Sequence, residues 1–541
     1  MRTVLRILPV ILLALLVPRD AFTDDTDSKL DDQVGKGDQF VAIFVRMEDQ
    51  MFANGGDYER FCAEQSKKPK RLELRKQVIK TLQSKANKSF TKLGPTLLKL
   101  MSDGELRNIQ RYWIVNGFAC EATGKAAKSL AKFKPVSFIY RQRKAEQHLV
   151  PATGKQKSFK KQHKLHAKIL ANYQDDADQP WDPSKYEIPW NLKRIGADRA
   201  WAGSAEVKGV TGRGVVIAVL DSGMMSIDSL TAGLWINSGE SLNGRDDDNN
   251  GYVDDVFGYD FRGNNPYTVD VSKPAHGTLC AGIVAGRPAG DMRERPIVTG
   301  IAPRAKIMPL VGNGQLKAYE YALSNGADIL SMSYTWDAQE LGQYRGLVRT
   351  AHEHLSAAGV VSVGGAGNYN GKRPEGWQIG TPKDIPCVIA AAGVTEDGKI
   401  AKASSRGPVS WAGVRYFDTE SESPPEGKPK SKPDVTGCFG GYPMWTHIDL
   451  WEGAKLKRLR VVHTDSDGYI LATGPRGNSF SGPHVAGVAA LMLEANPNLP
   501  VWHLKRLLES TCTDLGPEGR DTTFGAGMLQ ADKAVEAALT F

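Results

Sequence analysis

The apolar residues of this chain follow two patterns, and the change between them falls near Trp190. Before it, runs rich in Val, Ile and Phe predict strands at Phe40–Met47 and Pro135–Arg143. Between them, Leu72–Leu100 has the spacing of an amphipathic helix, interrupted at Gly94–Pro95. A strand and turn are expected at Arg111–Ala122 and a helix at Gly124–Phe133. These elements predict a small α+β domain.

Beyond Trp190, runs of Val, Ile and Ala alternate with helical segments. The runs at Val215–Asp221, Lys306–Val311 and Gly359–Asn368 are apolar along almost their whole length. Strands of this kind belong to parallel sheets that helices cover on both faces. We therefore predict an α/β fold, a mostly parallel sheet with helices on both faces, preceded by the small α+β domain. A hairpin is also expected within Trp451–Gly474.

The N-terminus has the pattern of a secretory signal. Arg2 and Arg6 precede the apolar run Ile7–Val17, which is too short to cross a bilayer, and residues 1–22 are expected to be removed. The alternative is a buried helix or strand. No other long apolar run follows, so we expect a secreted protein, extracellular or periplasmic, that has no membrane partner once the signal is removed.

Charge and cysteine content narrow the classes of partner. The net charge is +8, and the excess of Lys and Arg lies before Tyr186, which favours association with the mildly acidic remainder. The basic run Lys155–Lys168 could bind an anionic polymer, but it lacks interleaved aromatic residues, and a solvated linker fits it better. We expect no nucleic-acid partner.

The six cysteines leave disulfide pairing open, and none has the spacing of a zinc site.

The most specific motif is GNSFSGPHVAG, Gly477–Gly487, which places Ser479 between a turn and a helix start. A serine hydroxyl is a good nucleophile only when a base takes its proton and donors hold the oxyanion. The expected base is His276 of HGTLCAG, oriented by Asp221 at the end of VVIAVLD. Ser481 is the rival nucleophile, two residues later.

Together these motifs resemble the subtilisin-like serine endopeptidases, or subtilases. The resemblance covers residues 190–539, and the order Asp221, His276, Ser479 is that of subtilisin. The motifs SSRGPV, KPDVTG and FGAGMLQADKAV support it independently. It implies that Asn368, in VGGAGNYN, donates from its side chain to the oxyanion.

Some positions near these motifs depart from the family pattern. Asn478 stands where Thr is usual, Phe480 where Met is usual, and Gly365 where Ala is common. Two further side chains, His484 and Cys280, are expected to be buried packing groups.

The resemblance also implies where a substrate lies. Relatives hold the peptide as an added β-strand between segments that match SMSYTW and GGAG. Glycines usually follow SMS, whereas Tyr334, Thr335 and Trp336 stand here, so the primary specificity pocket should be reshaped. The substrate-binding residues expected from this are Ser331, Ser333, Tyr334, Gly364, Gly365 and Ala366.

The first domain resembles a subtilase propeptide, most clearly in VNGFACEATGKAAKSLAKF. The expected organisation is a signal peptide at 1–22, a propeptide at 23–145, a linker with the processing site at 146–185 and a peptidase domain at 186–541. The resemblance implies that the propeptide is an intramolecular inhibitor. The other expected partners are protein or peptide substrates, and the enzyme is expected to be a monomer.

A second candidate site is the acidic loop RDDDNNGYVDDVFGYDF, residues 245–261. Oxygen ligands alternate along it, and this spacing suits a structural Ca²⁺ ion. The final Glu of the usual calcium loop is absent and no flanking helices are expected, so a plain acidic turn is the alternative. The expected metal ligands are Asp246, Asp248, Asn250, Tyr252 and Asp254.

The sequence therefore predicts a secreted serine endopeptidase that is made as a zymogen. One alternative is a catalytically silent subtilase-like protein that only binds, although the full set of catalytic residues disfavours it. Another is an esterase, but no GxSxG elbow surrounds Ser479, and the order of the three residues differs from that of such enzymes.

Overall fold

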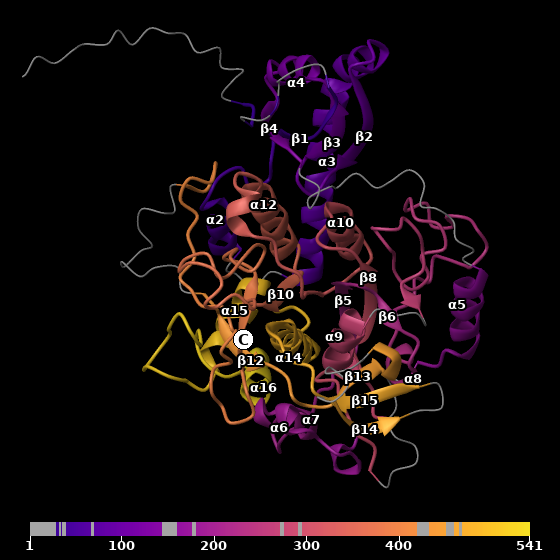
Figure 1. Ribbon diagram of the computed structural model, residues 1–541, viewed down its shortest axis with the longest axis vertical. Helices are drawn as coiled ribbons and strands as arrows, with labels where there is room; N and C mark the ends of the chain where they lie inside the picture. Colours follow the sequence, from indigo (N-terminus) through magenta and orange to yellow (C-terminus); the bar gives the residue numbers. More distant parts are fainter. Residues whose placement is uncertain are drawn as a thin grey trace, which may run out of the picture.

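The chain contains a small N-terminal α+β unit and a larger α/β unit (Figure 1). The computed structural model describes residues 29–31, 34, 39–65, 70–142, 160–175, 180–270, 275–289, 295–418, 432–450, 459–464 and 468–541. The expected signal segment at 1–22 lies outside the described residues, as do residues 146–159 and 176–179 of the expected linker.

The N-terminal unit is an antiparallel sheet with the strand order β2–β3–β1–β4. Alternate residues of β1 point to opposite faces: Ile43 and Val45 pack under α3 and α4, whereas Phe44 packs toward the larger unit. The elements are β1 (Val41–Met47), α2 (Asp57–Glu64), α3 (Arg71–Ser102), β2 (Leu106–Tyr112), β3 (Gly117–Ala122), α4 (Gly124–Ala131) and β4 (Val136–Arg141).

Helix α3 is continuous, so the interruption predicted at Gly94–Pro95 is wrong. Proline has no N–H and removes one helical hydrogen bond. The helix continues because Leu93 and Leu97, on either side of Pro95, are buried against the sheet. Burying each leucine stabilises the fold by about 1.5–3 kcal/mol, which offsets the lost bond.

Six parallel strands form the sheet of the larger unit, in the order β12–β11–β10–β9–β5–β8. The prediction of a parallel sheet built from apolar runs is confirmed. The strands are β5 (Val216–Asp221), β8 (Lys306–Val311), β9 (Ile329–Met332), β10 (Val361–Gly365), β11 (Ile389–Val394) and β12 (Val435–Cys438).

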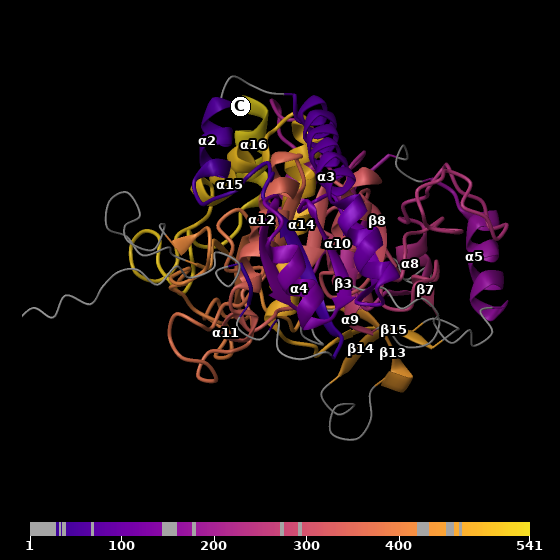
Figure 2. The same cartoon turned by 90° about the horizontal axis from the view of Figure 1, so that it is seen from above.

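Helices cover both faces of this sheet. In β5, Ile217 and Val219 pack with α9 and α14, whereas Ala218 and Leu220 pack with α10 and α12. The N-terminal unit lies over the second face as a further layer, and Figure 2 shows β3, α3 and α4 in front of α10 and α12. The helices are α9 (Ala275–Ala285), α10 (Leu316–Ser324), α12 (Tyr344–Ala357) and α14 (Ser481–Ala495), which the 3-10 turn η5 (Asn478–Phe480) precedes.

The expected linker contains a docked helix, α5 (Lys160–Asn172), where a solvated segment was expected. Its His166 is fully buried, and Nε2 lies 3.0 Å from the carbonyl oxygen of Val269. The other elements around the sheet are α6 (Trp190–Arg194), α7 (Ala197–Ala202), β6 (Met224–Met225), α8 (Asp228–Thr231), β7 (Val269–Asp270), α11 (Ala338–Leu341), α15 (Val501–Ser510) and α16 (Ala531–Thr540).

The predicted hairpin before the nucleophile motif is present as the antiparallel pair β14 (Arg460–Thr464) and β15 (Tyr469–Thr473). A third strand, β13 (Met444–His447), completes this small sheet. All six cysteines are free thiols. Within the described ranges, every helix falls short of the length and apolarity that crossing a bilayer requires.

Candidate active site

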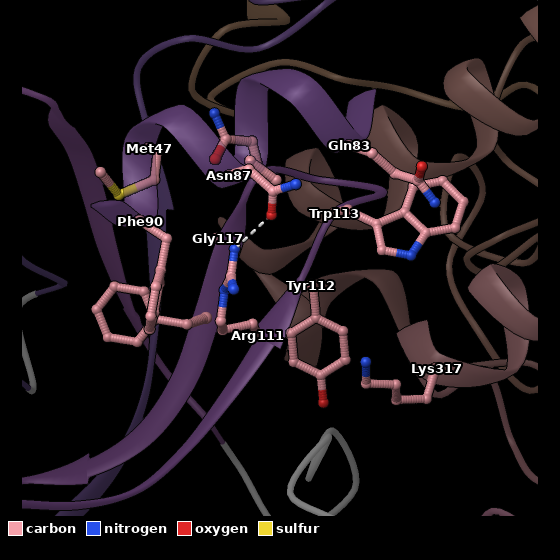
Figure 3. Close-up of a pocket in the computed structure, with 12 residues that line it drawn as sticks. Met47, Gln83, Asn87, Phe90, Arg111, Tyr112, Trp113, Gly117 and Lys317 are labelled. Atoms are coloured by element: carbon pink, nitrogen blue, oxygen red, sulfur yellow. Dashed lines mark hydrogen bonds between the residues drawn. The ribbon is translucent and has the colours of Figure 1, made fainter. Parts of the chain in front are cut away.

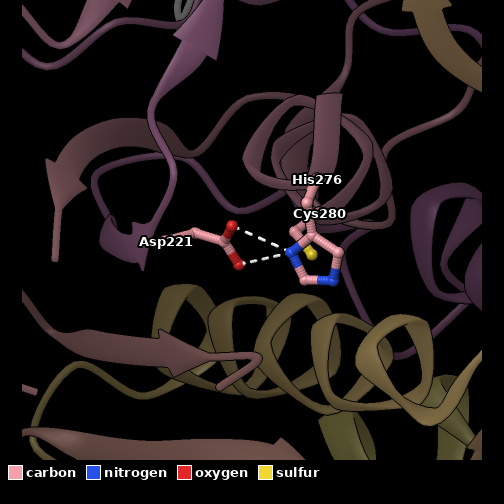
Figure 4. Close-up of side chains that lie close together, drawn as sticks. All are labelled: Asp221, His276 and Cys280. Carbon is pink, nitrogen blue, oxygen red and sulfur yellow. Dashed lines mark hydrogen bonds and ion pairs between the residues drawn. The ribbon is translucent and has the colours of Figure 1, made fainter. Parts of the chain in front are cut away.

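Asp221 and His276 meet where β5 and α9 approach each other. Asp221 is the last residue of β5, and its two carboxylate oxygens lie 2.8 and 2.9 Å from Nδ1 of His276 (Figure 4). The approach requires glycine at position 277, because a Cβ on Gly277 would lie 2.1 Å from the carbonyl oxygen of Gly223. The small residues of the DSG and HGT motifs therefore set the geometry of the pair.

The carboxylate of Asp221 controls the protonation of the imidazole. Burial opposes the charged form of His276, but the hydrogen bond and negative charge of Asp221 together outweigh it and raise the pKa of His276 above its ordinary value. Asp221 is only 8% exposed, so water screens this interaction weakly. When Nδ1 holds its proton against Asp221, Nε2 is the atom free to accept a proton from a nucleophile.

Ser479 lies in the turn η5, beside this pair. Its carbonyl oxygen accepts hydrogen bonds from Ser333 Oγ at 2.8 Å and from Cys280 Sγ at 3.7 Å. Cys280 is one helical turn beyond His276 on α9 (Figure 4). The ring of Phe480, the next residue after Ser479, has its centroid 6.0 Å from that of His276. The structure thus brings together the segments that carry the predicted nucleophile, base and orienting carboxylate.

Two other side chains near Ser479 are committed to packing. Ser481 is fully buried, and its hydroxyl donates to the carbonyl oxygen of Cys438 and to Oδ1 of Asn478, each at 3.2 Å. His484 is also fully buried, with Nδ1 2.8 Å from the carbonyl oxygen of Phe480. Neither group faces solvent, which favours Ser479 over Ser481 as the nucleophile.

Asn368 follows β10 and is tied to the turn that carries Ser479. Its Oδ1 accepts the backbone N–H of Asn478 at 2.9 Å, which leaves Nδ2 as the side-chain group that can donate elsewhere. Asn478 donates from its own Nδ2 to the carbonyl oxygen of Gly367 at 2.7 Å and to Ser404 Oγ at 2.9 Å. The residue that replaces the usual Thr therefore joins three segments around Ser479.

The segments expected to bind substrate end two neighbouring strands, β9 and β10. Glycine is required where β10 ends, because a Cβ on Gly365 would lie 1.8 Å from the carbonyl oxygen of Asn478. Among the expected substrate residues, Ser331 and Ala366 are buried, whereas Ser333 and Tyr334 are partly exposed. A Cβ on Gly364 would lie 2.4 Å from the carbonyl oxygen of Met332, so the two segments also approach each other closely.

Comparison with known proteins shows the family of this chain. The sequence profile of the Subtilase family matches residues 212–527. The chain belongs to this family. Fervidolysin of Fervidobacterium pennivorans is 26% identical over 378 residues, which are 65% of this chain and 44% of fervidolysin. Subtilisin E of Bacillus subtilis (strain 168) is 25% identical over 360 residues, 64% of this chain and 71% of subtilisin E.

A calcium-dependent protease of Trichormus variabilis (strain ATCC 29413 / PCC 7937) is 28% identical over 293 residues, 49% of this chain and 40% of that protein. The chain thus spans less than half the length of fervidolysin and of this protease. The chain also matches the crystal structure of fervidolysin, a keratinolytic enzyme related to subtilisin. The match spans 94% of this chain and 62% of the fervidolysin chain, with a TM-score of 0.52 and 18% identity. This similarity supports a shared fold.

In this subtilase the acidic loop gathers only part of the expected ligand set. Asp246 and Asp248 bring carboxylate oxygens within 4.8 Å of each other and of Glu240, a residue that no motif marks in the sequence. Asp254 is used differently, since its Oδ1 accepts the backbone N–H groups of Asn243 and Gly244 at 2.9 and 2.8 Å.

The side chains of the two other expected ligands make contacts that stabilise the loop. Asn250 donates from Nδ2 to Asp248 Oδ2 at 3.1 Å. The ring of Tyr252 packs against the rings of Tyr259 and Tyr321, with centroids 4.7 and 5.1 Å away. These contacts stabilise the loop around the three carboxylates.

Negative charge is concentrated beside these carboxylates. Burial raises the pKa of Asp255 to about 6; hydrogen bonds from Tyr321 and Asn250 oppose the rise, and the charges of Asp248 and Glu240 add to it. A divalent cation among such oxygens would offset this repulsion, so the residues present fit Ca²⁺.

Proposed function

We propose that this subtilase is a serine endopeptidase. Ser479 attacks the peptide carbonyl, and His276 takes the serine proton and then gives it to the leaving amine. Asp221 orients His276 and stabilises its charged form. The observation that carries the proposal is the contact of both Asp221 oxygens with His276 Nδ1, beside the turn of Ser479.

The oxyanion formed in this step would be held by Nδ2 of Asn368 and the backbone N–H of Ser479. Support comes from the occupied Oδ1 of Asn368, which fixes the orientation of the amide. The positive end of the α14 helix dipole also lies next to Ser479 and favours developing negative charge.

The test is the full-length Ser479→Ala variant. It should neither react with a fluorophosphonate probe nor cleave casein, whereas Ser481→Ala, which removes a packing hydroxyl, should still be labelled. A Ser479→Ala chain that processes itself and cleaves casein would refute the assignment. A wild-type chain that stays unlabelled would favour the binding-only alternative, and faster turnover of esters than of matched amides, with no protein cleavage, would favour an esterase.

We further propose that residues 23–145 are an inhibitory propeptide. Support comes from a buried ionic contact: the guanidinium groups of Arg71 and Arg75, in α3, lie 2.8 and 3.2 Å from Oδ1 of Asp328, next to β9. Glu320, in α10, accepts the backbone N–H of Ile114 at 3.1 Å. Each of these charged side chains is buried, as in a stable interface.

Apolar packing extends this contact. Phe44, Tyr112 and Ile114 of the N-terminal unit belong to the same core as Tyr319 and Leu347 of the larger unit. Beside them lies a cavity of about 260 Å³, where Tyr112 lies next to Lys317 of α10 (Figure 3). The Nζ of Lys317 is 5.2 Å from the centroid of the Tyr112 ring. Such a contact would keep the propeptide bound after its peptide bond is cut.

Export through the signal at residues 1–22, processing within residues 146–185 and monomeric activity on peptide substrates complete the proposal. N-terminal sequencing of the secreted protein tests the first two. A mature N-terminus inside the folded region after residue 186, or retention of residues 1–22, would contradict them.

We also propose that Glu240, Asp246 and Asp248 hold a structural Ca²⁺ ion. Support comes from the convergence of their oxygens and from the calcium-dependent protease among the relatives. Bound calcium would neutralise the carboxylates and stabilise the loop. Asn250, Tyr252 and Asp254 remain candidate ligands through other atoms of the same loop.

A further inference from the structure

Lys383 carries a buried amine that the proposed catalytic groups do not use. Its side chain is 1% exposed, and Nζ has no hydrogen-bond partner among the residues that the structure describes. The adjacent Asp384 accepts through Oδ2 from Arg345 Nη2 at 2.7 Å and from Thr381 Oγ1 at 2.9 Å, and its Oδ1, which has no partner among the described residues, makes no bond to Nζ. A buried ammonium group without a partner is costly, so this position favours a ligand that supplies one.

The amine lies between the two segments proposed to receive the substrate. Its stem packs on the end of β10, because a Cβ on Gly364 would lie 2.9 Å from Cε of Lys383. On the other side, Nζ is 5.1 Å from the centroid of the Tyr334 ring. The backbone before Lys383 is fixed to the same segment, since the N–H of Trp336 donates to the carbonyl oxygen of Thr381 at 2.9 Å.

The charged groups near Lys383 are compatible with the binding of an anion to its amine. Burial lowers the pKa of Lys383 to about 7, and the negative charges of Asp384 and Asp221 oppose this shift. The positive charge of Lys383 also acts on His352, whose pKa is lowered to about 3 by burial and then by that charge.

We infer that Lys383 determines specificity and that this enzyme prefers an acidic residue, Asp or Glu, immediately before the scissile bond. This inference rests on the proposed peptidase function. Tyr334 and Trp336, whose ring centroids are 5.5 Å apart, would flank the substrate side chain, and Nζ of Lys383 would bind its carboxylate. An apolar side chain would leave the amine buried and unpaired, so the site selects against it.

The first test uses the full-length chain after secretion and self-processing, with active sites counted by fluorophosphonate labelling. Fluorogenic peptides that differ only in the residue before the scissile bond (Glu, Gln, Asp, Asn or Leu) are compared by kcat/KM. A hydrogen bond to a buried charge predicts that Glu exceeds Gln, and Asp exceeds Asn, by about 10- to 100-fold in at least one pair. Equal values in both pairs, or a preference for Leu, would overturn the inference.

The second test changes the amine. Lys383→Met keeps a long unbranched side chain and removes the charge, so the ratio of kcat/KM for the acidic peptide to that for its amide should fall to about one. Lys402→Met, at an exposed lysine, is the matched control and should keep the ratio of the wild type. If Lys383→Met keeps the preference, Lys383 is not the determinant.

A third measurement does not depend on the folding of any variant. Peptide aldehydes that end in Glu or Gln are compared as inhibitors of the wild-type enzyme, and the Glu aldehyde should bind about 10- to 100-fold more tightly. A protein that is labelled but prefers apolar residues refutes the specificity alone. A protein that is neither labelled nor cleaves any peptide refutes the peptidase function, and the inference falls with it.

Discussion

The N–H of Asn478 donates to Oδ1 of Asn368 at 2.9 Å, and Nδ2 of Asn478 donates to the carbonyl oxygen of Gly367 at 2.7 Å. These two bonds link the residue before Ser479 with Asn368 and its preceding neighbour. Asn478 is fully buried, so water cannot replace either bond. The proposed oxyanion donor and the nucleophile therefore move as one unit, and this unit depends on a residue that stands where relatives usually have Thr.

Replacing Asn478 should lower turnover more than substrate binding. Asn478→Ala removes one donor from the Gly367 carbonyl and one from the Ser404 hydroxyl, which still accept the N–H groups of Ser405 and Gly393, so each lost bond should cost about 0.5–1.5 kcal/mol of stability. Alanine keeps the backbone N–H that donates to Asn368, but the turn loses its side-chain bond to Gly367, so we expect kcat to fall about tenfold with little change in KM, whereas Asn368→Ala should cost about 10²–10³-fold. Steady-state kinetics and thermal unfolding check both. If Asn478→Ala has the kcat and melting temperature of the wild type, the link has no role.

The raised pKa of His276 predicts the acidic limb of the pH profile. His276 must be neutral to act as the base, and contact with Asp221 favours the protonated form, so activity is lost as the pH falls through the raised pKa. The midpoint of kcat/KM should therefore lie above the ordinary histidine value of about 6.5. Kinetics between about pH 5 and 9 measure it.

The variant Asp221→Asn provides the comparison. It removes the charge that raises the pKa of His276, so burial alone acts and the midpoint should fall, together with a loss of about 10⁴-fold in kcat. A wild-type midpoint well below 6.5, or an unchanged midpoint in Asp221→Asn, would contradict the assigned pair.

The motifs at the ends of apolar strands predict where Asp221 and Asn368 lie, because local sequence determines both places; their catalytic roles stay predictions. Asp221 is the last residue of β5 and Asn368 comes shortly after β10, because a buried parallel strand fixes where the chain leaves the sheet. Glu240 and Lys383 could not be predicted in this way, since each acquires its role through contacts with segments distant in sequence. The docking of α5 was missed for the same reason: a Lys-rich segment with few apolar residues still buries His166 against β7.

The ionic contact of α3 should contribute to propeptide binding. Arg75→Met removes one of the two guanidinium groups at Asp328 and leaves the mature peptidase unchanged, because Arg75 lies in the proposed propeptide. We expect the variant propeptide to bind the mature peptidase at least about tenfold more weakly. Dilution of the processed complex should therefore release more active enzyme. Lys76→Met, at the next and exposed position of α3, is the control and should behave as the wild type. Equal release by the two variants would contradict this role.

Acid should weaken the same complex through His354. This α12 side chain accepts the N–H of Phe52 at Nε2 (3.3 Å), Nδ1 contacts the carbonyl oxygen of Ile114, and burial lowers its pKa to about 4. A histidine exposed after release has a pKa of about 6.5. The free domain therefore binds a proton that the complex excludes, and docking should weaken as the pH falls from about 6.5 toward about 4.

The variant His354→Gln isolates this effect. A glutamine amide can keep both hydrogen bonds, to Phe52 and to Ile114, but it does not titrate. Dilution-induced release of activity, measured across this pH range, should show a steeper pH dependence in the wild type than in the variant. The buried Glu320 titrates alike in both proteins, so it cancels in the comparison. Parallel curves would show that His354 is not responsible.

Calcium should stabilise the peptidase through Glu240, Asp246 and Asp248. A ligand that binds only the folded state at about 100 times its Kd adds about 2.7 kcal/mol, so chelation should lower the melting temperature by several degrees. In Asp248→Asn the response to added calcium should shrink, because one of three converging charges is lost. Asp247→Asn is the matched control, since Asp247 binds Ser241 and Asn243 outside the cluster and should keep the response. A melting temperature that EDTA leaves unchanged would contradict a structural ion at this loop.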